Sequence, residues 1–532
     1  MQKKPILTST FSFEYLITSG ALYVDKTQYF HRLVTNVSNC YFCSRPRRFG
    51  KSLAISIFEN IFLGKKELFE GLYIASTDYD WQVFPVIHID MARSGSTSAQ
   101  DLFDSLMRNV KENAERYGVT LSSESPWLCF DELISQLCKK TGKKVVILID
   151  EYDRPLTENI NDAKTLEEVR NVLDSFYQII KGQEPNERFV FMTGVTKFSK
   201  VSIFSKLNNL TDITMSREYA CMFGYTQEEL EENFAPYIDE HVRENNLDRT
   251  EFIAKIKKWY DGFKFHWKSE TVYNPVSIGK FFENECEFQN FWFSTSTPTF
   301  ITKLARMQRL TQEDIYDTRL SDASMNAFDL ASFATGNISK EIVIQLLFQT
   351  GYLTIGNKIE SSFDVLFSVR FPNYEVEVSF SRILFEVYSG IRTETAISYV
   401  ANIIEAANED KHERLIEIFK NFLAAIPYTI QIPQEKYYQS ILFSIVKMCG
   451  MDISAEDATN KGRIDAVLDT PKYIYLFEFK IDQDAEIALE QIVQKEYFQK
   501  FIEGAKEKGK EIRCFGINFS SKERNITDWR VG

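Results

Sequence analysis

The sequence predicts an α/β protein of more than one domain. Its N-terminal part should hold a mostly parallel sheet, followed by a helical middle region and a smaller α/β unit at the C-terminal end. Short apolar runs alternate with amphipathic stretches up to Thr193, and helical periodicity dominates from about Gly224. Strands that are apolar on both faces and joined by helices are typical of a parallel sheet covered on both sides.

Length and composition limit the class of protein. A chain of 532 residues is too long for one ordinary core, and we expect three domains at residues 1–223, 224–375 and 376–532. The balance of 44% apolar and 26% charged residues is that of a globular protein. A net charge of -13 argues against a protein whose whole surface is basic and binds nucleic acid or membranes non-specifically. With no long uncharged apolar stretch, we expect a cytoplasmic protein without a membrane partner.

The individual elements follow from local patterns. The four apolar runs predict strands at residues 39–44, 84–90, 143–150 and 187–193. Thr226 and Glu229 fit a capping box that opens the helical region. Near the C-terminal end, GRIDAVL and KYIYLFEFK predict two strands, AEIALEQIVQKEYFQKFIEGAKEKG a helix, and IRCFGINF a last strand.

The segment SRPRRFGKS at residues 44–52 ends like the phosphate-binding loop G-x-x-x-x-G-K-[ST], but Arg45 replaces its first glycine. It lies where a predicted strand turns into a predicted helix, and free amides at a helix start bind phosphate. Lys51 would neutralise the β and γ phosphates of ATP, and Ser52 would bind Mg²⁺. The nucleotide-binding residues expected here are Arg48, Phe49, Gly50, Lys51, Ser52 and Leu53. Because the three residues G-K-S are weak evidence by themselves, the alternative is a chance match to the motif.

The run VVILIDE supplies the acids that a phosphate loop requires. Asp150 closes a predicted strand, where ligands bind in open α/β sheets, and would hold Mg²⁺. Glu151 would polarise an attacking water as the catalytic base. Two solvated acids are the alternative, which the combination of strand, loop, helix and acidic strand end disfavours. Thr193 is equally a γ-phosphate sensor or an ordinary strand-terminal threonine. Arg45, Arg47 and Arg48 suit a polyanion or are simply solvated.

A second candidate site lies in GRIDAVLDTPKYIYLFEFK, where DTPK is predicted to turn between two strands. Pairing Leu468 with Tyr473 places Asp465 diagonally across from Glu478, at about 7–8 Å, with Lys480 on the same face. Two carboxylates that hold Mg²⁺ beside a lysine are suited to metal-dependent phosphodiester cleavage, in which all three act as catalytic residues. The alternative is an exposed charged hairpin.

Several motifs carry a resemblance to a known family. YVDKT, RPRRFGKSL, LIDEYDRPL, FMTGVTKFSKVSIFSKLNNLTDIT, WYDGF and YNPVS closely resemble a bacterial family of predicted AAA-type ATPases, in which arginine commonly replaces the first loop glycine. The resemblance covers most of residues 1–375. It implies a P-loop fold with the catalytic-glutamate strand arrangement, and ATP and Mg²⁺ as cofactors. The oligomeric state stays open, with a homo-oligomer as one alternative because AAA-type relatives often form rings.

The C-terminal segments GRID, EFK and ALEQIVQKEYFQKF resemble the PD-(D/E)XK nuclease superfamily domain often fused to this ATPase family. This implies a restriction-endonuclease-like fold with DNA or RNA as partner, although Ile464 replaces the proline of the superfamily name. Glu435 and Glu456 are weaker candidates for a further acid, or surface glutamates. Gln491 matches the glutamine of the trailing helix and would contact substrate or position Lys480, unless it is a plain surface residue.

Residues 495–525 hold eight Lys or Arg against five Glu, an excess where a phosphate backbone would dock, or else a solvated amphipathic helix. The leading hypothesis is an ATPase that controls a Mg²⁺-dependent nuclease. The alternative is a nucleotide-switched interaction or nucleic-acid-binding protein with an inactive nuclease-like domain. A small-molecule kinase would leave the last domain unexplained.

Overall fold

The computed structural model divides into two compact units, of which the first comprises Met1–Phe300 with Thr318–Val376 and the second Ile301–Asp317 with Glu377–Gly532. The residues that the structure describes are 3–95, 97–199, 209–292, 303–305, 307–308, 310–326, 328–329, 338–360, 365–426, 435–448, 452–459 and 462–532.

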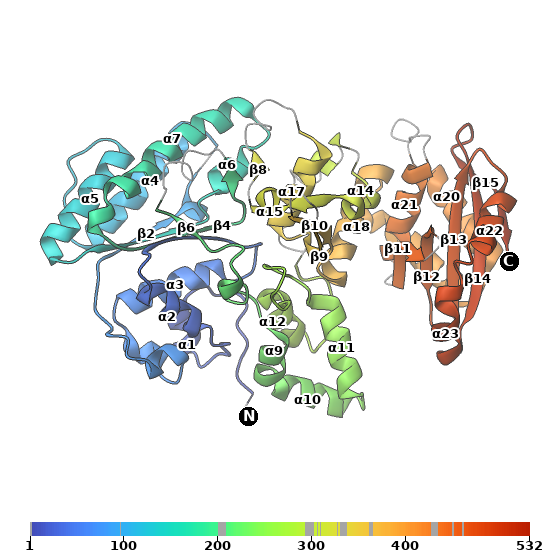
Figure 1. The fold of residues 1–532 in the computed structure, drawn as a ribbon, viewed down its shortest axis with the longest axis horizontal. Helices are drawn as coiled ribbons and strands as arrows, with labels where there is room; N and C mark the ends of the chain where they lie inside the picture. Colours follow the sequence, from blue (N-terminus) through green and yellow to red (C-terminus); the bar gives the residue numbers. More distant parts are fainter. Residues whose placement is uncertain are drawn as a thin grey trace. The chain divides into compact units, whose positions relative to one another are not determined.

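A five-stranded parallel sheet lies at the centre of the first unit (Figure 1). Its order is β2-β3-β4-β1-β6, and its strands are β1 (Cys40–Ser44), β2 (Val86–Asp90), β3 (Val145–Asp150), β4 (Glu187–Gly194) and β6 (Thr211–Asp212). β1 and β3 are buried along their whole length. The parallel sheet predicted from the apolar runs is confirmed, and β6 is a further strand too short to show in the pattern.

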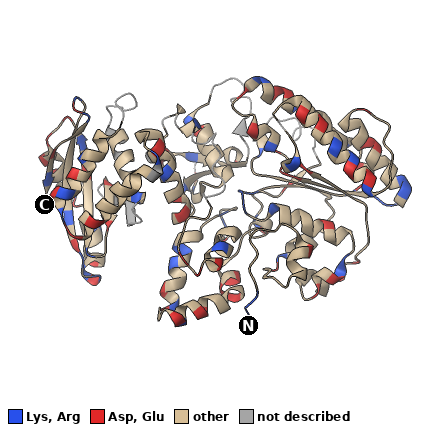
Figure 2. Cartoon of the chain, turned by 180° about the vertical axis from the view of Figure 1, so that it is seen from behind, with Lys and Arg blue, Asp and Glu red and all other residues tan. Residues whose placement is uncertain are grey.

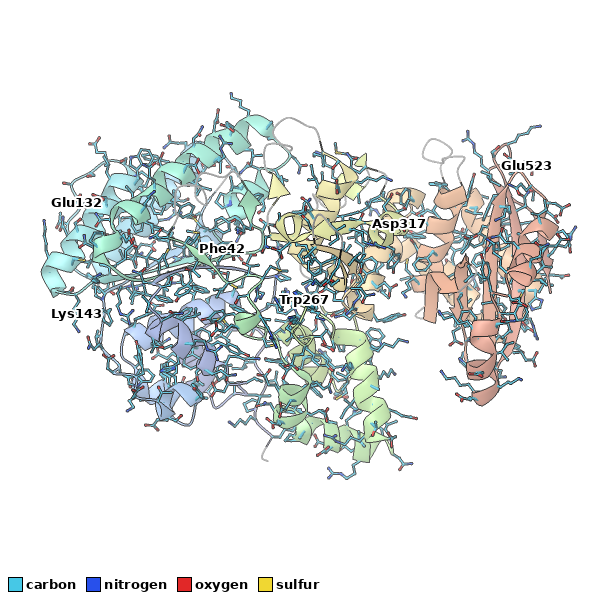
Figure 3. All side chains as sticks on the ribbon, viewed as in Figure 1. Phe42, Glu132, Lys143, Trp267, Asp317 and Glu523 are labelled. Carbon is cyan, nitrogen blue, oxygen red and sulfur yellow. The ribbon has the colours of Figure 1, made fainter. Side chains whose placement is uncertain are left out.

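Helices cover both faces of this sheet, as Figure 1 shows. α1 (Phe13–Thr18), α2 (Thr27–Thr35) and α3 (Lys51–Phe62) lie on one side, and α4 (Ala99–Arg116), α5 (Pro126–Thr141), α6 (Arg154–Glu158) and α7 (Ala163–Gly182) on the other. Phe58 of α3 packs its ring on Phe191 of β4, with centroids 4.7 Å apart. Phe42 of β1 lies inside this core, whereas Lys143 lies at the periphery of the unit (Figure 3). The apolar face of α3 therefore packs directly on the sheet.

The rest of the first unit is helical at its start and contains small sheets after it. The helices are α9 (Gln227–Asn233), α10 (Ala235–Glu244), α11 (Arg249–Tyr260), α12 (Pro275–Glu283), α15 (Asp322–Asn326) and α17 (Lys340–Thr350). The predicted capping box of Thr226 and Glu229 is present. An antiparallel sheet β7-β10-β9 and a two-stranded parallel sheet were not predicted; their strands are β5 (Phe198–Ser199), β7 (Arg319–Ser321), β8 (Phe328–Asp329), β9 (Thr354–Glu360) and β10 (Val365–Arg370).

The second unit is built on a mixed sheet in the order β11-β12-β13-β14-β15, in which only β13 and β14 are parallel. Its strands are β11 (Asp452–Thr459), β12 (Gly462–Asp469), β13 (Tyr473–Ile481), β14 (Glu511–Ser520) and β15 (Asn525–Val531). Its helices are α14 (Gln312–Asp317), α19 (Thr393–Asn408), α20 (His412–Ala424), α21 (Glu435–Met448), α22 (Ala485–Gln494) and α23 (Gln499–Glu507), and α18 (Tyr374–Ser389) connects to the first unit. The predicted long helix is thus two helices, with Glu496 in the left-handed conformation between them.

The β12–β13 hairpin differs in register from the prediction. Leu468 pairs with Tyr475, two residues further along than the expected Tyr473. The backbone N–H of Thr470 donates to the carbonyl of Tyr473 at 2.8 Å, so the turn spans residues 470–473 rather than 469–472. This places Pro471 at the second turn position, which the fixed φ of proline favours.

Charge is distributed without a single dominant sign. Figure 2 shows basic and acidic residues interspersed along the helices of both units. Within the described part of the chain, no helix is sufficiently long and apolar to cross a membrane.

Candidate functional sites

The loop between β1 and α3, residues 45–50, forms the start of the first candidate site. Gly50 caps α3 with φ 81°, a left-handed conformation that glycine adopts without strain. Arg48 is also left-handed, with φ 68°. The loop thereby turns the first amides of α3 toward the space above the sheet, where free N–H groups and the helix dipole favour an anion.

Lys51 lies inside this loop and connects it to the acids of β3. Its Nζ donates to the carbonyls of Arg45 at 3.0 Å and Pro46 at 2.9 Å. Burial lowers the pKa of Lys51, and the negative charges of Asp150 and Glu151 oppose that shift. The lysine is therefore within electrostatic reach of the predicted carboxylates.

Ser52, Asp150 and Glu151 are brought together as predicted from the sequence. Burial raises the pKa of Asp150, while a hydrogen bond from Ser52 and the charge of Lys51 lower it. Glu151 is left-handed at φ 52° and pairs with Arg154 at 3.1 Å. A serine hydroxyl beside a carboxylate is an oxygen donor set that suits Mg²⁺, which usually takes its other ligands from phosphate and water. Among the described residues, no three His, Cys, Asp or Glu side chains are grouped so as to hold a metal ion by themselves.

The order of the strands places β4 between the two parts of the first site. β3, which carries the acids, is not the neighbour of β1, because β4 lies between them. Both strands still end at the same edge of the sheet, since Cys43 pairs in parallel with Thr193, and Ile149 with Met192. The β1–α3 loop and the acids therefore meet at one edge of the sheet, where Ser52 reaches Asp150 with a hydrogen bond.

Arg45, which replaces the first glycine of the motif, is not a solvated or phosphate-facing arginine. Its side chain is buried, and its guanidinium donates to the carbonyls of Ser44 at 2.9 Å, Thr214 at 2.8 Å and Tyr219 at 3.1 Å. The guanidinium also lies over the ring of Phe265 at 4.1 Å. Arg45 therefore anchors the loop to distant segments, in contrast to the exposed Arg47.

At the C-terminal end of β4, Thr193 and Thr196 differ in whether they face the pocket. The hydroxyl of Thr193 donates to the carbonyl of Cys43 at 2.8 Å, and the side chain is fully buried. Thr196 lines the pocket instead. Its backbone N–H donates to the buried Asp153 at 2.7 Å. Sequence reasoning missed both residues, although Asp153 is the third acid of the quoted LIDEYD segment.

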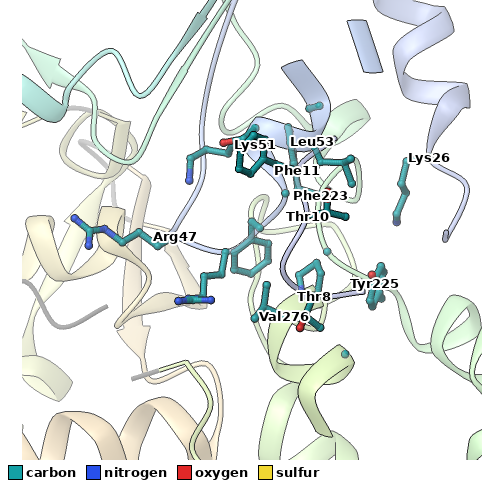
Figure 4. Close-up of a pocket in the computed structure, with 18 of the residues that line it drawn as sticks. Thr8, Thr10, Phe11, Lys26, Arg47, Lys51, Leu53, Phe223, Tyr225 and Val276 are labelled. Carbon is teal, nitrogen blue, oxygen red and sulfur yellow. The ribbon is translucent and has the colours of Figure 1, made fainter. Parts of the chain in front are cut away.

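A pocket of about 620 Å³ extends from the β1–α3 loop (Figure 4). This volume lies within the usual range for small-molecule sites. Its lining includes the loop and helix residues Arg48, Phe49, Gly50, Lys51, Ser52 and Leu53, together with Glu151 and Arg154. Figure 4 shows Thr8, Tyr225 and Val276 farther from Lys51 in the same pocket. Basic, acidic, aromatic and aliphatic side chains therefore line one cavity.

The hairpin of the second unit brings together the second set of predicted residues. Since Ala466 pairs with Phe477, Asp465 and Glu478 come next on the two strands, opposite one another rather than diagonal. The carboxylate of Asp465 accepts from the backbone N–H of Phe479 at 2.7 Å. The Nζ of Lys480 lies 3.2 Å from Glu478, whose side chain is only 2% exposed.

Gln491 lies against the same carboxylate. Its side-chain amide on α22 donates to Glu478, so it positions the glutamate rather than Lys480. Gly516 on β14 makes this possible, because a Cβ there would lie 2.3 Å from the carbonyl oxygen of Ala485 on α22. Only a glycine allows the helix to approach the sheet this closely.

Lys495 is a further cation that sequence reasoning did not single out. A hydrogen bond with Tyr497 raises the pKa of Lys495, and the nearby negative charges of Glu478 and Asp465 raise it further. It follows Gln491 by four residues, the spacing that places two side chains on one helix face. The side chains of Glu435 and Glu456, the weaker acid candidates, lie outside the described part of the structure.

Comparisons with known proteins match both parts of the chain. The model of a family described as Predicted AAA-ATPase matches residues 8–204, and that of the PD-(D/E)XK nuclease superfamily matches residues 433–529. The chain is also 34% identical over 517 residues to the "Uncharacterized protein in vnfD 5'region" of Azotobacter chroococcum mcd 1, which covers 96% of this chain and 95% of that protein. The chain therefore belongs to the family of that protein, with a predicted AAA-ATPase part followed by a PD-(D/E)XK nuclease superfamily part.

Proposed function

We propose that the first unit binds and hydrolyses ATP with Mg²⁺, and that this controls a Mg²⁺-dependent nuclease in the second unit. The observation that supports it most is that Lys51, Ser52 and Glu151 line the 620 Å³ pocket, while Asp150 is hydrogen-bonded by Ser52 and faces the charge of Lys51. The three-domain division at residues 1–223, 224–375 and 376–532 remains part of this proposal.

In the ATP site, the amides at the start of α3 and the ammonium of Lys51 would bind the β and γ phosphates. Ser52 and Asp150 would hold Mg²⁺, which supplies positive charge to the phosphoryl oxygens. Glu151 would accept a proton from the attacking water while the water oxygen bonds to the γ phosphorus. The bond from that phosphorus to the bridging oxygen breaks, which leaves ADP and phosphate. Before that step its carboxylate must leave Arg154, with which it pairs in this structure.

In the nuclease site, Asp465 and Glu478 would hold a divalent cation that supplies charge to the scissile phosphate and acidifies water. Lys480 would orient the attacking water and offset negative charge on the phosphate, and Gln491 would hold the Glu478 carboxylate in place. Water oxygen bonds to phosphorus and one P–O bond breaks, which releases a phosphate end and a hydroxyl end. The excess of basic residues at 495–525 supports nucleic acid, DNA or RNA, as the substrate.

The second candidate function is a nucleotide-switched binding protein whose nuclease-like unit only holds nucleic acid. The close contacts of Glu478 with Lys480 and Gln491 would also be compatible with a site that retains its geometry without turnover. Both functions predict ATP binding, so they separate only at the hairpin.

The test measures ATP turnover and cleavage of labelled single- and double-stranded DNA and RNA with Mg²⁺. Lys51→Ala should abolish ATP binding, and Asp465→Asn should abolish cleavage while ATP turnover remains. Lys480→Ala should also abolish cleavage. Its control is Lys472→Ala, which removes an exposed lysine in the hairpin turn and should leave cleavage unchanged. Equal cleavage by wild type and Asp465→Asn would favour the binding protein and contradict the nuclease.

A further inference from the structure

One buried carboxylate, that of Glu375, links the first turn of α18 to two other segments of the first unit. It accepts from the hydroxyl of Ser277 at 2.8 Å and from the backbone N–H groups of Phe291 at 2.6 Å and Trp292 at 2.7 Å. The side chain is fully buried. Residues of α18 from Glu377 onward belong to the second unit, so Glu375 lies where the chain leaves the first unit.

The donors to Glu375 come from two segments that also form the wall of the nucleotide pocket. Ser277 lies on α12, directly after Pro275 and Val276, which line the pocket. Trp292 lines it as well, with its ring 4.8 Å from that of Tyr352, a further lining residue. Glu375 does not itself line the pocket but holds two separate parts of its wall.

A second connection runs from the β1–α3 loop to the same turn. Phe49 of the loop packs its ring on Phe263, with centroids 4.8 Å apart. Next to Phe263, a Cβ on Gly262 would lie 1.9 Å from the carbonyl oxygen of Pro372, so these backbones are in direct contact just before α18. The motifs WYDGF and YNPVS thus both meet the chain between Pro372 and Glu375.

We propose that Glu375 is a positioning residue of the nucleotide pocket, and that it transmits occupancy of the pocket to α18. The inference rests on the proposed binding of ATP by the first unit. A ligand shifts a conformational equilibrium only through different contacts in the two states. Nucleotide contacts with α12 and Trp292 supply that difference, and the three hydrogen bonds of Glu375 make the start of α18 follow the pocket wall.

The variants are Glu375→Ala, which removes all three acceptor contacts, and Glu375→Gln, which keeps one acceptor oxygen. The control is Glu287→Gln, because Glu287 is exposed and lies on the segment that carries Phe291 and Trp292. ATP affinity is measured by calorimetry, and hydrogen exchange is followed over residues 374–389 with and without ATP. We expect the dissociation constant to rise 10- to 100-fold for Glu375→Ala and about 5-fold for Glu375→Gln, with loss of ATP-dependent protection in α18.

The exchange readout separates coupling from simple support of the pocket, because loosened walls alone would not remove the response of α18 at saturating ATP. A folded Glu375→Gln protein with wild-type affinity and wild-type protection of α18 would overturn the inference. A wild-type protein that binds ATP without any change in α18 would overturn it too. If the wild type binds no ATP at all, the proposed function and this inference fail together.

Discussion

Arg45 provides a sharp test of how the β1–α3 loop is built. By motif, Arg45→Gly restores the glycine of the phosphate-binding loop and should improve nucleotide binding. In the structure, the guanidinium is buried and satisfies the carbonyls of Ser44, Thr214 and Tyr219. We therefore expect the glycine variant to be less stable and to bind ATP no more tightly than the wild type.

The size of the effect follows from these contacts. Hydrogen bonds from a charged donor contribute roughly 1.5–3 kcal/mol each, so three amount to about 5–9 kcal/mol. Burial of the guanidinium charge costs several kcal/mol, which its removal returns. The net loss of stability on Arg45→Gly should be about 2–5 kcal/mol, with the stacking on Phe265 at 4.1 Å included in the upper end.

The assay is urea unfolding followed by circular dichroism, together with ATP titration of the folded variant. Arg47→Ala, in the same loop but exposed, is the control and should change stability by less than about 0.5 kcal/mol. A glycine variant as stable as the wild type that binds ATP tenfold more tightly would refute a structural role for Arg45.

Three further predictions concern other parts of the molecule. Burial raises the pKa of Glu187 from 4.5 to about 8, so the folded state holds a proton that the unfolded chain has lost and stability should fall as pH rises between these values. In urea unfolding midpoints taken at pH 5, 6.5 and 8, Glu187→Gln should no longer show the decrease in stability with pH. Glu184→Gln, which changes an exposed neighbour, should still show most of that decrease. Gly516→Ala should push α22 from the sheet, cost about 1–3 kcal/mol and abolish cleavage, while Gly504→Ala, with open space around it, should be neutral or stabilising in thermal unfolding. Glu151→Gln should bind ATP normally in a filter assay yet lose at least about 100-fold in turnover, and unchanged turnover would exclude it as the base.

Sequence patterns predicted Lys51 and Asp150 because both follow strand ends, but they missed Thr196 and Asp153. The carboxyl ends of parallel strands meet at one edge of a sheet, which is why Lys51 and Asp150 were expected near one another. The role of Arg45 could not be predicted, because its partners Thr214, Tyr219 and Phe265 are more than a hundred residues away. Glu375 and its partner Ser277 are likewise far apart in the chain, by 98 residues.

The predicted register of the β12–β13 hairpin was wrong by two residues. The prediction that Asp465, Glu478 and Lys480 share one face of the sheet is unaffected by that error. Side chains alternate along a strand, so a shift of two preserves the face that carries Asp465, Glu478 and Lys480. The turn was misassigned because DTPK and TPKY both contain turn residues, and only the position of Pro471 separates them. The contact of Gln491 with Glu478 depends on the close approach of α22 over Gly516, which no local pattern encodes.

The most direct test of an ATP-controlled nuclease is the cleavage rate of labelled nucleic acid with Mg²⁺, measured with and without ATP. The wild type should cleave at rates that differ at least several-fold between the two conditions. Lys51→Ala should show one rate in both, and Glu478→Ala should show no cleavage in either. Equal wild-type rates with and without ATP would contradict control by the first unit, and cleavage by Glu478→Ala would contradict the assigned nuclease site.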